Sequence, residues 1–313
     1  MLRFVLRRLA AGIGLIVVVS VATFFLLYAT GGDVARSILG QTASQETVDQ
    51  KTHELGLDRP LLTQFGDWLS HAVRGDLGES WFTGQAVVDA ITSRAAVTLS
   101  LVIGATLVSA VVATLLGVLA ARRGGWVDSL VQFISVLGIA IPGFLIAIGL
   151  VLVFAINLGW FEPTGYTKFA DSPGGWLASI TLPVIALSIG AIAGVTQQVR
   201  GSMLDAQRQD WVRTLRSRGL PESRVVYEHA LRNAAGPALS VLALQFIALI
   251  GGAIFIEVIF ALPGLGQVAV VSTTQSDIPL VMGLVIAVTV LVVVVNLIVD
   301  LLQGWLNPKV RLS

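Results

Sequence analysis

Six long apolar segments dominate this chain, and each is long enough to cross a membrane as an α-helix. About 20 apolar residues span the ~30 Å hydrocarbon core of a bilayer. Only 12% of the residues are charged and the mean hydropathy is +0.84, whereas about a quarter of the residues in a soluble domain are charged. The sequence therefore predicts an all-α integral membrane protein with six transmembrane helices. We place these helices at 9–30, 95–121, within 129–158, within 176–199, at about 237–262 and at about 279–305.

The first and third segments carry features that bear on their form. The apolar run 9–30 is longer than the apolar region of a usual secretory signal peptide, and no small-x-small cleavage site follows it cleanly. We therefore expect it to remain as the first transmembrane helix. Pro142-Gly143 interrupts the third segment, which predicts a kink there because proline removes a backbone donor from the helix.

The distribution of basic residues predicts the orientation of the helices. Cytosolic loops of membrane proteins carry an excess of Lys and Arg, and long loops cross the membrane largely regardless of charge. With the N-terminus inside, the cytosolic segments hold 14 of the 20 basic residues, and five of the other six lie in one long outer loop. The sequence thus predicts that both termini are cytosolic. The inner segments would be 1–8, 122–128, 200–236 and 306–313.

Three regions follow from this topology. We expect 1–30 to form a short cytosolic stub and the first transmembrane helix, and 31–94 to form an extracytoplasmic segment. The remaining region, 95–313, would be a five-helix core that contains the cytosolic loop 200–236.

The outer segment has a recognisable internal pattern. Two helix-like stretches, 45–55 and 61–72, are separated by a turn that ends at Pro60, because a residue before proline avoids the helical region. Further on, Val87 and Ile91 share one face with Val88 just ahead of the second membrane helix, which is typical of an interfacial helix.

Residue types that enzymes and metal sites require are scarce. The chain has no cysteine, which excludes disulfides, thiolate metal sites and cysteine nucleophiles. Its histidines, His53, His71 and His229, are too scattered for a metal cage, and no lysine follows a glycine as it does in a phosphate-binding Gly-Lys-Ser/Thr loop. We therefore expect no catalytic residue, no metal and no cofactor on this chain, and no nucleic-acid partner.

Residues 200–232 form a charged island between two long apolar runs, and they hold seven of the 20 Lys and Arg residues. Asp210 is expected to cap a short helix over 211–218, because its carboxylate can accept the free amides of the first turn. Gly219 stands where a left-handed residue commonly ends a helix. Pro221 then favours the start of a second helix, which we expect to end near Asn233.

A short basic helix of this kind has two interpretations. It can fit a groove on a soluble partner, with Arg213, Arg216 and Arg218 making charge-assisted contacts at the rim. Alternatively, the loop only obeys the positive-inside rule and contacts the headgroups of the lipid bilayer. The charges alone leave both interpretations open.

The order of residues in the island is more specific than its charge. It contains Trp211-Val212-Arg213-Thr214-Leu215-Arg216-Ser217-Arg218-Gly219-Leu220, followed by His229-Ala230-Leu231-Arg232-Asn233 and by Pro237. This run strongly resembles the cytoplasmic loop of ABC importer permeases of the dipeptide/oligopeptide/nickel class. It departs from the general permease motif, Glu-Ala-Ala followed by three residues and Gly, in having Arg213-Thr214-Leu215 before Gly219.

The resemblance extends over almost the whole chain. The first half contains Met1-Leu2-Arg3-Phe4, Leu55-Gly56-Leu57-Asp58-Arg59-Pro60 and Arg74-Gly75-Asp76-Leu77-Gly78. The second half contains Glu257, Phe260-Ala261-Leu262-Pro263-Gly264-Leu265-Gly266, Asp277, Asn296-Leu297-Ile298-Val299-Asp300 and Asn307-Pro308. Together these stretches are highly specific, although each alone would be weak. The last of them departs from the family's Asp-Pro-Arg, which reads Asn307-Pro308-Lys309 here.

The resemblance implies a type I ABC importer permease fold in a bacterial cell membrane. It also implies a second, normally different permease subunit, two ABC ATPase subunits that bind ATP and Mg²⁺, and an extracytoplasmic solute-binding protein. This chain would form half of the translocation pathway for di- or oligopeptides, or for nickel chelates or haem, which relatives also handle. Asp210 to Pro221 would be the coupling helix and its exit, which contact an ATPase subunit.

Polar residues inside the predicted membrane helices are the remaining candidates, because a charge at the centre of a span costs about 3 kcal/mol. Glu257 lies toward the outer end of the fifth helix, and Asn296 and Asp300 lie four residues apart on the sixth. They could relay protons or hydrogen-bond between helices. The connection between the fifth and sixth membrane helices contains Pro263, Gly264 and Gly266. This composition predicts a tight turn or a segment that dips back into the protein.

Two other classes of protein remain open from the sequence. A self-contained secondary transporter or channel would need intramembrane ionisable groups, and the chain offers little beyond Glu257 and Asp300. An intramembrane enzyme is disfavoured because the chain lacks cysteine, intramembrane histidine and paired carboxylates at mid-membrane depth.

Overall fold

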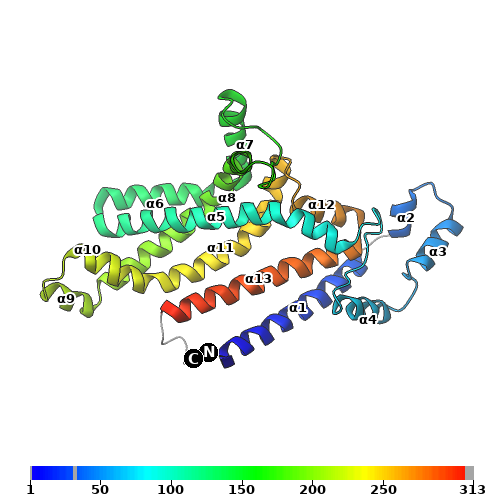
Figure 1. Cartoon of the computed structure of the whole chain (residues 1–313), viewed down its shortest axis with the longest axis horizontal. Coiled ribbons are helices and arrows are strands. Elements are labelled where there is room, and N and C mark those ends of the chain that lie inside the picture. The colour runs from blue at the N-terminus through cyan, green and yellow to red at the C-terminus, as the bar shows by residue number, and fades with distance from the viewer. Residues whose placement is uncertain (1, 31–33, 307–313) are drawn as a thin grey trace. The chain divides into compact units, whose positions relative to one another are not determined.

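The structure is a computed structural model that describes residues 2–30 and 34–306. Within these residues the regular secondary structure is helical, apart from one isolated antiparallel bridge between Glu79 and Ala86 (Figure 1). The helices, with π-helical segments labelled η, are α1 (Leu2–Thr30), α2 (Val34–Leu39), α3 (Gln45–Glu54), α4 (Leu61–Ala72), α5 (Val87–Arg123), α6 (Gly125–Ala140), α7 (Gly143–Leu150), η1 (Val151–Asn157), α8 (Pro173–Gln207), α9 (Asp210–Ser217), α10 (Glu222–Arg224), η2 (Val225–Ala230), α11 (Leu231–Ile259), α12 (Leu265–Gln275) and α13 (Ile278–Leu306).

The apolar helices agree with the predicted membrane spans. In the part of the chain that the structure describes, five helices are long and apolar enough to cross a membrane, namely Val5–Leu27, Val87–Arg123, Pro173–Gln207, Glu222–Ile259 and Ile278–Gly304. A sixth apolar segment consists of α6 followed by α7 and η1, and it is bent by 95°. Counting this bent pair as one span gives the six helices that the sequence predicts.

The bend in the third apolar segment lies at Pro142. Ile141 is extended, with φ −86° and ψ 120°, as expected for a residue that precedes proline. Pro142 also has no N–H group to continue the hydrogen bonding of α6. Figure 1 shows α7 turned away from the line of α6. The predicted interruption at Pro142-Gly143 is confirmed, whereas α8 continues as a helix through Pro183.

The chain divides into two compact units, the first made of residues 1–96 and 264–294 and the second of residues 97–263 and 295–313. In the first unit, aromatic side chains hold α4 against α1. The ring centroids of Phe65 and Phe24 are 5.1 Å apart, and those of Phe65 and Trp68 are 5.8 Å apart. The two predicted helical stretches of the outer segment are present as α3 and α4.

The first turn of α5 is also buried in the first unit. Val87 and Ile91 belong to a core cluster with Leu265 and Val268 of α12 and with Leu284 of α13. The face that was expected to form an interfacial helix is therefore the start of a continuous 37-residue helix. Val87 and Ile91 are covered by α12 and α13 of the same unit, whereas Val88 of the predicted face is exposed.

A buried carboxylate fixes the start of α13 in the first unit. The Ser80 hydroxyl donates a hydrogen bond to Asp277 Oδ2 over 2.5 Å. The Trp81 N–H donates a second one to Asp277 Oδ1 over 3.3 Å. Asp277 is 1% exposed, and a buried charge is tolerated only when it is hydrogen-bonded or paired. The loop before α5 is thus tied to a residue 197 positions further along the chain.

In the second unit, α8 is the central helix. It packs against α6, α7 and α11, and it approaches α5 closely at Gly117. A Cβ atom at Gly117 would lie 2.7 Å from Val199 Cβ and 3.0 Å from the Thr196 carbonyl oxygen. Small residues at such crossings let the backbones of membrane helices come together.

Gly117→Ala is expected to destabilise the second unit, because the added methyl group has no room unless α5 and α8 separate. Overpacking of this kind typically costs about 1–3 kcal/mol. Gly149→Ala is the matched control, since a Cβ at Gly149 in α7 would meet nothing within 4 Å. Thermal unfolding of the two purified variants in detergent measures the difference. Equal melting temperatures would contradict the close approach of α5 and α8.

Candidate functional site

The short helix predicted in the charged island exists as α9, which begins one residue earlier than expected. It spans Asp210–Ser217, with Gln209 in the N-cap position at φ −70° and ψ 146°. The prediction that Asp210 caps the helix is wrong, because Asp210 is itself helical and makes no cap hydrogen bond. Its carboxylate lies 3.5 Å from Arg213 Nη1 instead, and its charge still interacts favourably with the helix dipole.

The end of α9 has the predicted left-handed glycine. Gly219 has φ +81°, its N–H donates to the Arg216 carbonyl over 2.9 Å, and the Leu220 N–H donates to the Leu215 carbonyl over 3.3 Å. These two bonds form a Schellman motif, which satisfies carbonyl groups left over at the helix end. Pro221 then occupies the N-cap position of α10. The sharp change of direction is therefore set by local backbone chemistry.

One face of α9 is anchored in the core of the second unit. Val212 is fully buried, and α9 contacts the π-helical segment η2. Trp211 packs on a buried cluster that includes Met203 of α8 and Val226 of η2. The helix α9 is therefore packed against segments on both sides of the loop, α8 and η2.

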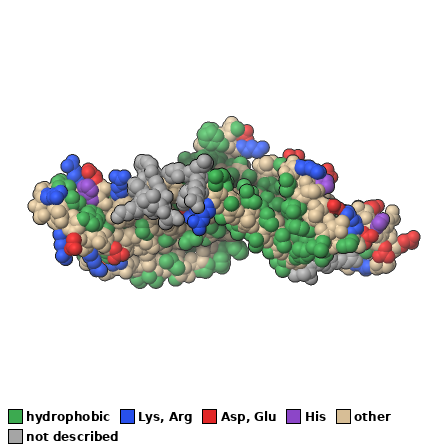
Figure 2. Space-filling model, turned by 90° about the horizontal axis from the view of Figure 1, so that it is seen from below, with side chains coloured by type: hydrophobic (Ala, Val, Ile, Leu, Met, Phe, Trp, Pro, Cys, Tyr) green, Lys and Arg blue, Asp and Glu red, His purple; other side chains and the backbone are tan. Residues whose placement is uncertain are grey.

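The opposite face of α9 is exposed and basic. Within α9 the exposed residues are Asp210, Arg213, Thr214, Arg216 and Ser217, and Arg218 just after it is exposed too, while Leu215 and Leu220 are half-buried. In Figure 2, Lys and Arg side chains gather at the end of the second unit where α9 and α10 lie. Arg216 donates to both carboxylate oxygens of Glu222 at 3.0 and 2.7 Å. This hydrogen bond raises the pKa of the Arg216 guanidinium, which stays charged.

The second helix of the island was expected to end near Asn233, but it continues well beyond this residue. Glu222–Ile259 forms one long helix, which passes through η2 into the fifth membrane span. Pro237 lies inside this helix. His229 is half-buried, whereas Arg232 and Asn233 are exposed. The helix continues where Val225, Val226 and Ala230 of η2 are buried and η2 contacts α8 and α9, so tertiary contacts override the polar composition.

Glu257 is the most deeply buried of the predicted intramembrane polar residues. It is fully buried in α11, and its Oε1 accepts a hydrogen bond from the Thr98 hydroxyl of α5 over 2.5 Å. This contact joins two helices 159 residues apart within the second unit. Interhelical hydrogen bonding, one of the two interpretations of Glu257, is therefore present.

The polar residues of α13 are less enclosed than Glu257. Asn296 and Asp300 are both half-buried. One turn further on, Gln303 Nε2 donates to Ser240 Oγ of α11 over 2.9 Å. Gln303 was not predicted from the sequence, because a single amide near the end of an apolar helix carries no distinctive pattern.

The connection after α11 is a turn followed by a helix that the sequence did not predict. The Leu262 N–H donates to the Glu257 carbonyl over 2.8 Å, Pro263 is exposed, and Gly264 is the N-cap of α12. Gly266 is buried in the first turn of α12. The tight turn is confirmed. The helix was missed because 265–275 is short and weakly amphipathic, so it lacks the periodicity that signals a helix.

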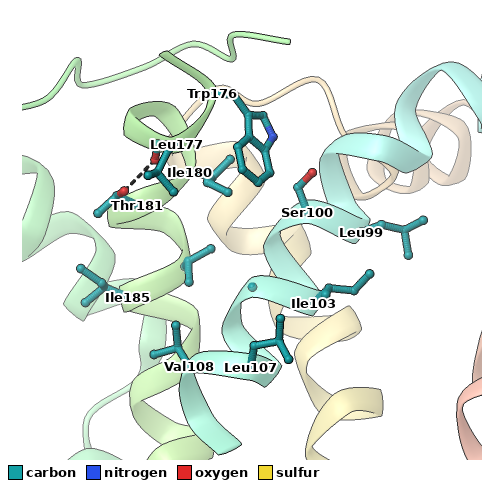
Figure 3. A pocket seen from close by; sticks show the side chains of 12 residues that line it. Leu99, Ser100, Ile103, Leu107, Val108, Trp176, Leu177, Ile180, Thr181 and Ile185 are labelled. Carbon is teal, nitrogen blue, oxygen red and sulfur yellow. Dashed lines mark hydrogen bonds between the residues drawn. The ribbon is translucent and has the colours of Figure 1, made fainter. Parts of the chain in front are cut away.

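A groove of about 590 Å³ lies between α5 and α8 in the second unit. Figure 3 shows apolar side chains of both helices facing the groove, with Trp176 at one end. The Thr181 hydroxyl already donates to the Leu177 carbonyl over 2.6 Å. Most of the lining is apolar, so the groove suits apolar groups better than polar ones.

Asp128 and Arg200 form an ion pair that sequence analysis did not single out. Arg200 Nη2 donates to Asp128 Oδ2 over 2.6 Å, and Arg200 Nε contacts Oδ1. The pair joins the start of α6 to α8. The sequence does contain a signal for these two residues, because each is a charged residue at the edge of an apolar run. Only the fold shows that they meet.

Among the described residues, no group of three or more His, Asp or Glu side chains could hold a metal ion.

Comparison with known proteins places this architecture in a family. The model of the family described as binding-protein-dependent transport system inner membrane component matches residues 113–312, and its N-terminal counterpart matches residues 1–102. A Brucella abortus protein named as a peptide transport system permease is 40% identical, over 99% of both chains. A probable peptide ABC transporter permease of Sinorhizobium fredii is 35% identical over 98% of this chain and 99% of its own length. The glutathione transport system permease GsiC of Escherichia coli is 36% identical, over 99% of both chains.

The apolar helices and the family match together show a multi-pass, all-α membrane permease. The chain belongs to the family of binding-protein-dependent transport system inner membrane components, and within it to the peptide class of ABC importer permeases.

Proposed function

We propose that this chain forms one half of the translocation pathway of an ATP-driven importer for di- or oligopeptides. The observation that carries the proposal is the similarity, from end to end, to permeases named for peptide and for glutathione transport. Glutathione is itself a short peptide, so both names point to one class of solute. Nickel chelates and haem are the alternative solutes.

The partners follow from membership of the family. This chain has no Gly-Lys-Ser/Thr loop of its own, and two ATPase subunits would bind ATP with Mg²⁺ and hydrolyse it. A second permease subunit would complete the pathway, and a solute-binding protein would deliver the solute on the outer side of the bacterial cell membrane. The extracytoplasmic segment, 31–94, would lie on that side.

The exposed face of α9 is the proposed docking surface for an ATPase subunit. The stretch from Asp210 to Pro221 presents three exposed arginines, two on α9 and Arg218 at its C-cap, while Val212 anchors the other face of α9. Charged rims of this kind can make charge-assisted hydrogen bonds in a partner's groove. His229, Arg232, Asn233 and Pro237 would support the helix that leaves this surface. Pro263, Gly264 and Gly266 would shape the outer turn.

Transport would depend on a difference between two conformations. ATP binding and hydrolysis in the partner can shift the permease between inward and outward access only if the nucleotide state changes the relative stability of the two states. Because α9 is packed on α8 and η2, a displacement of α9 would reach the membrane helices directly. A self-contained proton-coupled transporter finds less support, because the predicted membrane helices offer few ionisable groups beyond Glu257 and Asp300.

The function can be tested by reconstituting this permease with the products of its own operon in proteoliposomes. Peptide import is expected to require the binding protein, ATP and all subunits together, and the isolated chain should hydrolyse no ATP. Mass spectrometry of the solute bound to the binding protein would distinguish peptides from nickel chelates and haem. Robust ATP hydrolysis by the permease alone would contradict the proposal.

The proposed orientation can be tested separately, because the chain contains no cysteine. Single cysteines introduced at Ser217 and at Ser313 are expected to react with a membrane-impermeant thiol reagent only after the cell membrane is opened. A cysteine at Ser70 in α4 should react in intact cells, because α4 would lie outside. Labelling of Ser217→Cys from outside would overturn the topology.

A further inference from the structure

The ion pair between Asp128 and Arg200 is a rigid connection between α6 and α8. Both the Nε and Nη2 groups of Arg200 contact the carboxylate. The Gln132 amide donates to Asp128 Oδ2 over 3.2 Å. Two parallel hydrogen bonds between a guanidinium and a carboxylate fix orientation as well as distance. The relative position of the two helices at this point is therefore determined by the pair.

The pair is better shielded from water than the ion pairs of the loop. The side chains of Arg200 and Asp128 are 23% and 18% exposed, whereas those of Arg224 and Glu228 are 57% and 61% exposed. Exposed pairs contribute little, because water and salt screen them. Removal of one partner from a shielded pair leaves the other charge poorly hydrated and without a counter-ion. The first pair is thus expected to hold its geometry more firmly.

A second contact holds α6 along α8. A Cβ at Gly138 would lie 3.2 Å from Ala193 Cβ and 3.5 Å from the Ile189 carbonyl oxygen, so the two helices nearly touch there. Gly138 lies just before the bend at Pro142, while Asp128 lies in the first turn of α6. With one contact near each end, α6 is constrained to move with α8.

The same stretch of α8 is connected to the loop helix. Met203 and Ala206, which follow Arg200 on α8, are buried in a cluster with Val226 of η2, and Trp211 of α9 packs against it. A displacement of α9 is therefore transmitted to the end of α8 through close packing, and from α8 to α6 through the ion pair.

We propose that Asp128 and Arg200 are positioning residues for transport, which pass displacements of α9 to α6 and so to the bend at Pro142. The proposal rests on the proposed function, in which α9 docks an ATPase subunit. Without the pair, the end of α8 near Arg200 can follow α9 while the first turn of α6 stays behind, although the contact at Gly138 still holds the other end of α6. ATP hydrolysis would then continue with little movement of the membrane helices.

The test uses the complete transporter in proteoliposomes and measures the peptide imported per ATP hydrolysed. Asp128→Asn and Arg200→Gln are each expected to lower this ratio about tenfold, a typical size for coupling between sites, while the ATPase subunits stay bound. Arg200→Lys keeps the charge but not the bidentate contact, and it should give an intermediate ratio. Arg224→Gln, which breaks an exposed pair, is the matched control and should keep the wild-type ratio. Combining Asp128→Arg with Arg200→Asp should restore most of the loss.

A wild-type ratio in both Asp128→Asn and Arg200→Gln would overturn the proposal, and so would an exchange variant that is no better than either single variant. If the pair were purely structural, the variants would lower the yield of assembled transporter. The peptide imported per ATP hydrolysed by each assembled complex would stay unchanged, and this result would also contradict the proposal. Failure of the wild-type chain to bind any ATPase subunit would refute the proposed function itself. That result is visible before any variant is compared.

Discussion

Gly219→Val is expected to reduce ATP-dependent peptide uptake about tenfold while the chain remains inserted in the membrane. Gly219 has φ +81°, and a residue with a Cβ in this region is strained by roughly 1–2 kcal/mol, where 1.4 kcal/mol is a factor of ten in an equilibrium. A Cβ at Gly219 would meet nothing within 4 Å. The strain therefore lies in the backbone alone, and unwinding the last turn of α9 relieves it at the expense of the docking surface.

A series of variants separates backbone strain from other effects. Gly219→Asn should be milder than Gly219→Val, because asparagine tolerates the left-handed region better than a β-branched residue. Gly159→Val is the matched control, since Gly159 also has a positive φ of +64° and open space but lies far from α9 in the sequence. Pull-down of the ATPase subunits and uptake at matched expression are the measurements. Wild-type behaviour of Gly219→Val in both would remove α9 from the mechanism.

Glu257→Ala is expected to lower the stability of the permease by roughly 2–4 kcal/mol, because it removes the hydrogen bond from the Thr98 hydroxyl and opens a cavity. Glu257 is fully buried, and its contact with Thr98 joins α11 to α5. Glu257→Gln should cost much less, since an amide oxygen can still accept that hydrogen bond. Thermal unfolding in detergent gives the comparison.

Glu228→Ala is the control for Glu257, because the Glu228 side chain is 61% exposed and its removal should change stability little. The same variants distinguish the two interpretations of Glu257. If it only joins helices, Glu257→Gln should transport peptides nearly as well as the wild type at every pH. A transport defect in Glu257→Gln without any loss of stability would instead favour a proton relay.

Features set by neighbouring residues could be read from the sequence. The apolar runs predicted the membrane helices, since a span depends only on about 20 consecutive apolar residues. Pro142 predicted the interruption of the third span, and Gly219 predicted the left-handed end of α9. The cap at Asp210 failed because the helix started one residue earlier, at a boundary where Gln209 took the capping position. Helix ends are sensitive to small shifts of this kind.

The sequence by itself therefore determined the class of fold, the number of apolar segments and the loop helix, because each of these depends on residues close together in the chain. Only the tertiary structure decided which polar residues meet. Thr98 pairs with Glu257, Asp128 with Arg200 and Ser80 with Asp277, across separations of 159, 72 and 197 residues. It also decided that the helix from Glu222 continues through Asn233, and that α12 forms. Burial against distant helices controls these outcomes, and no local pattern of residues encodes it.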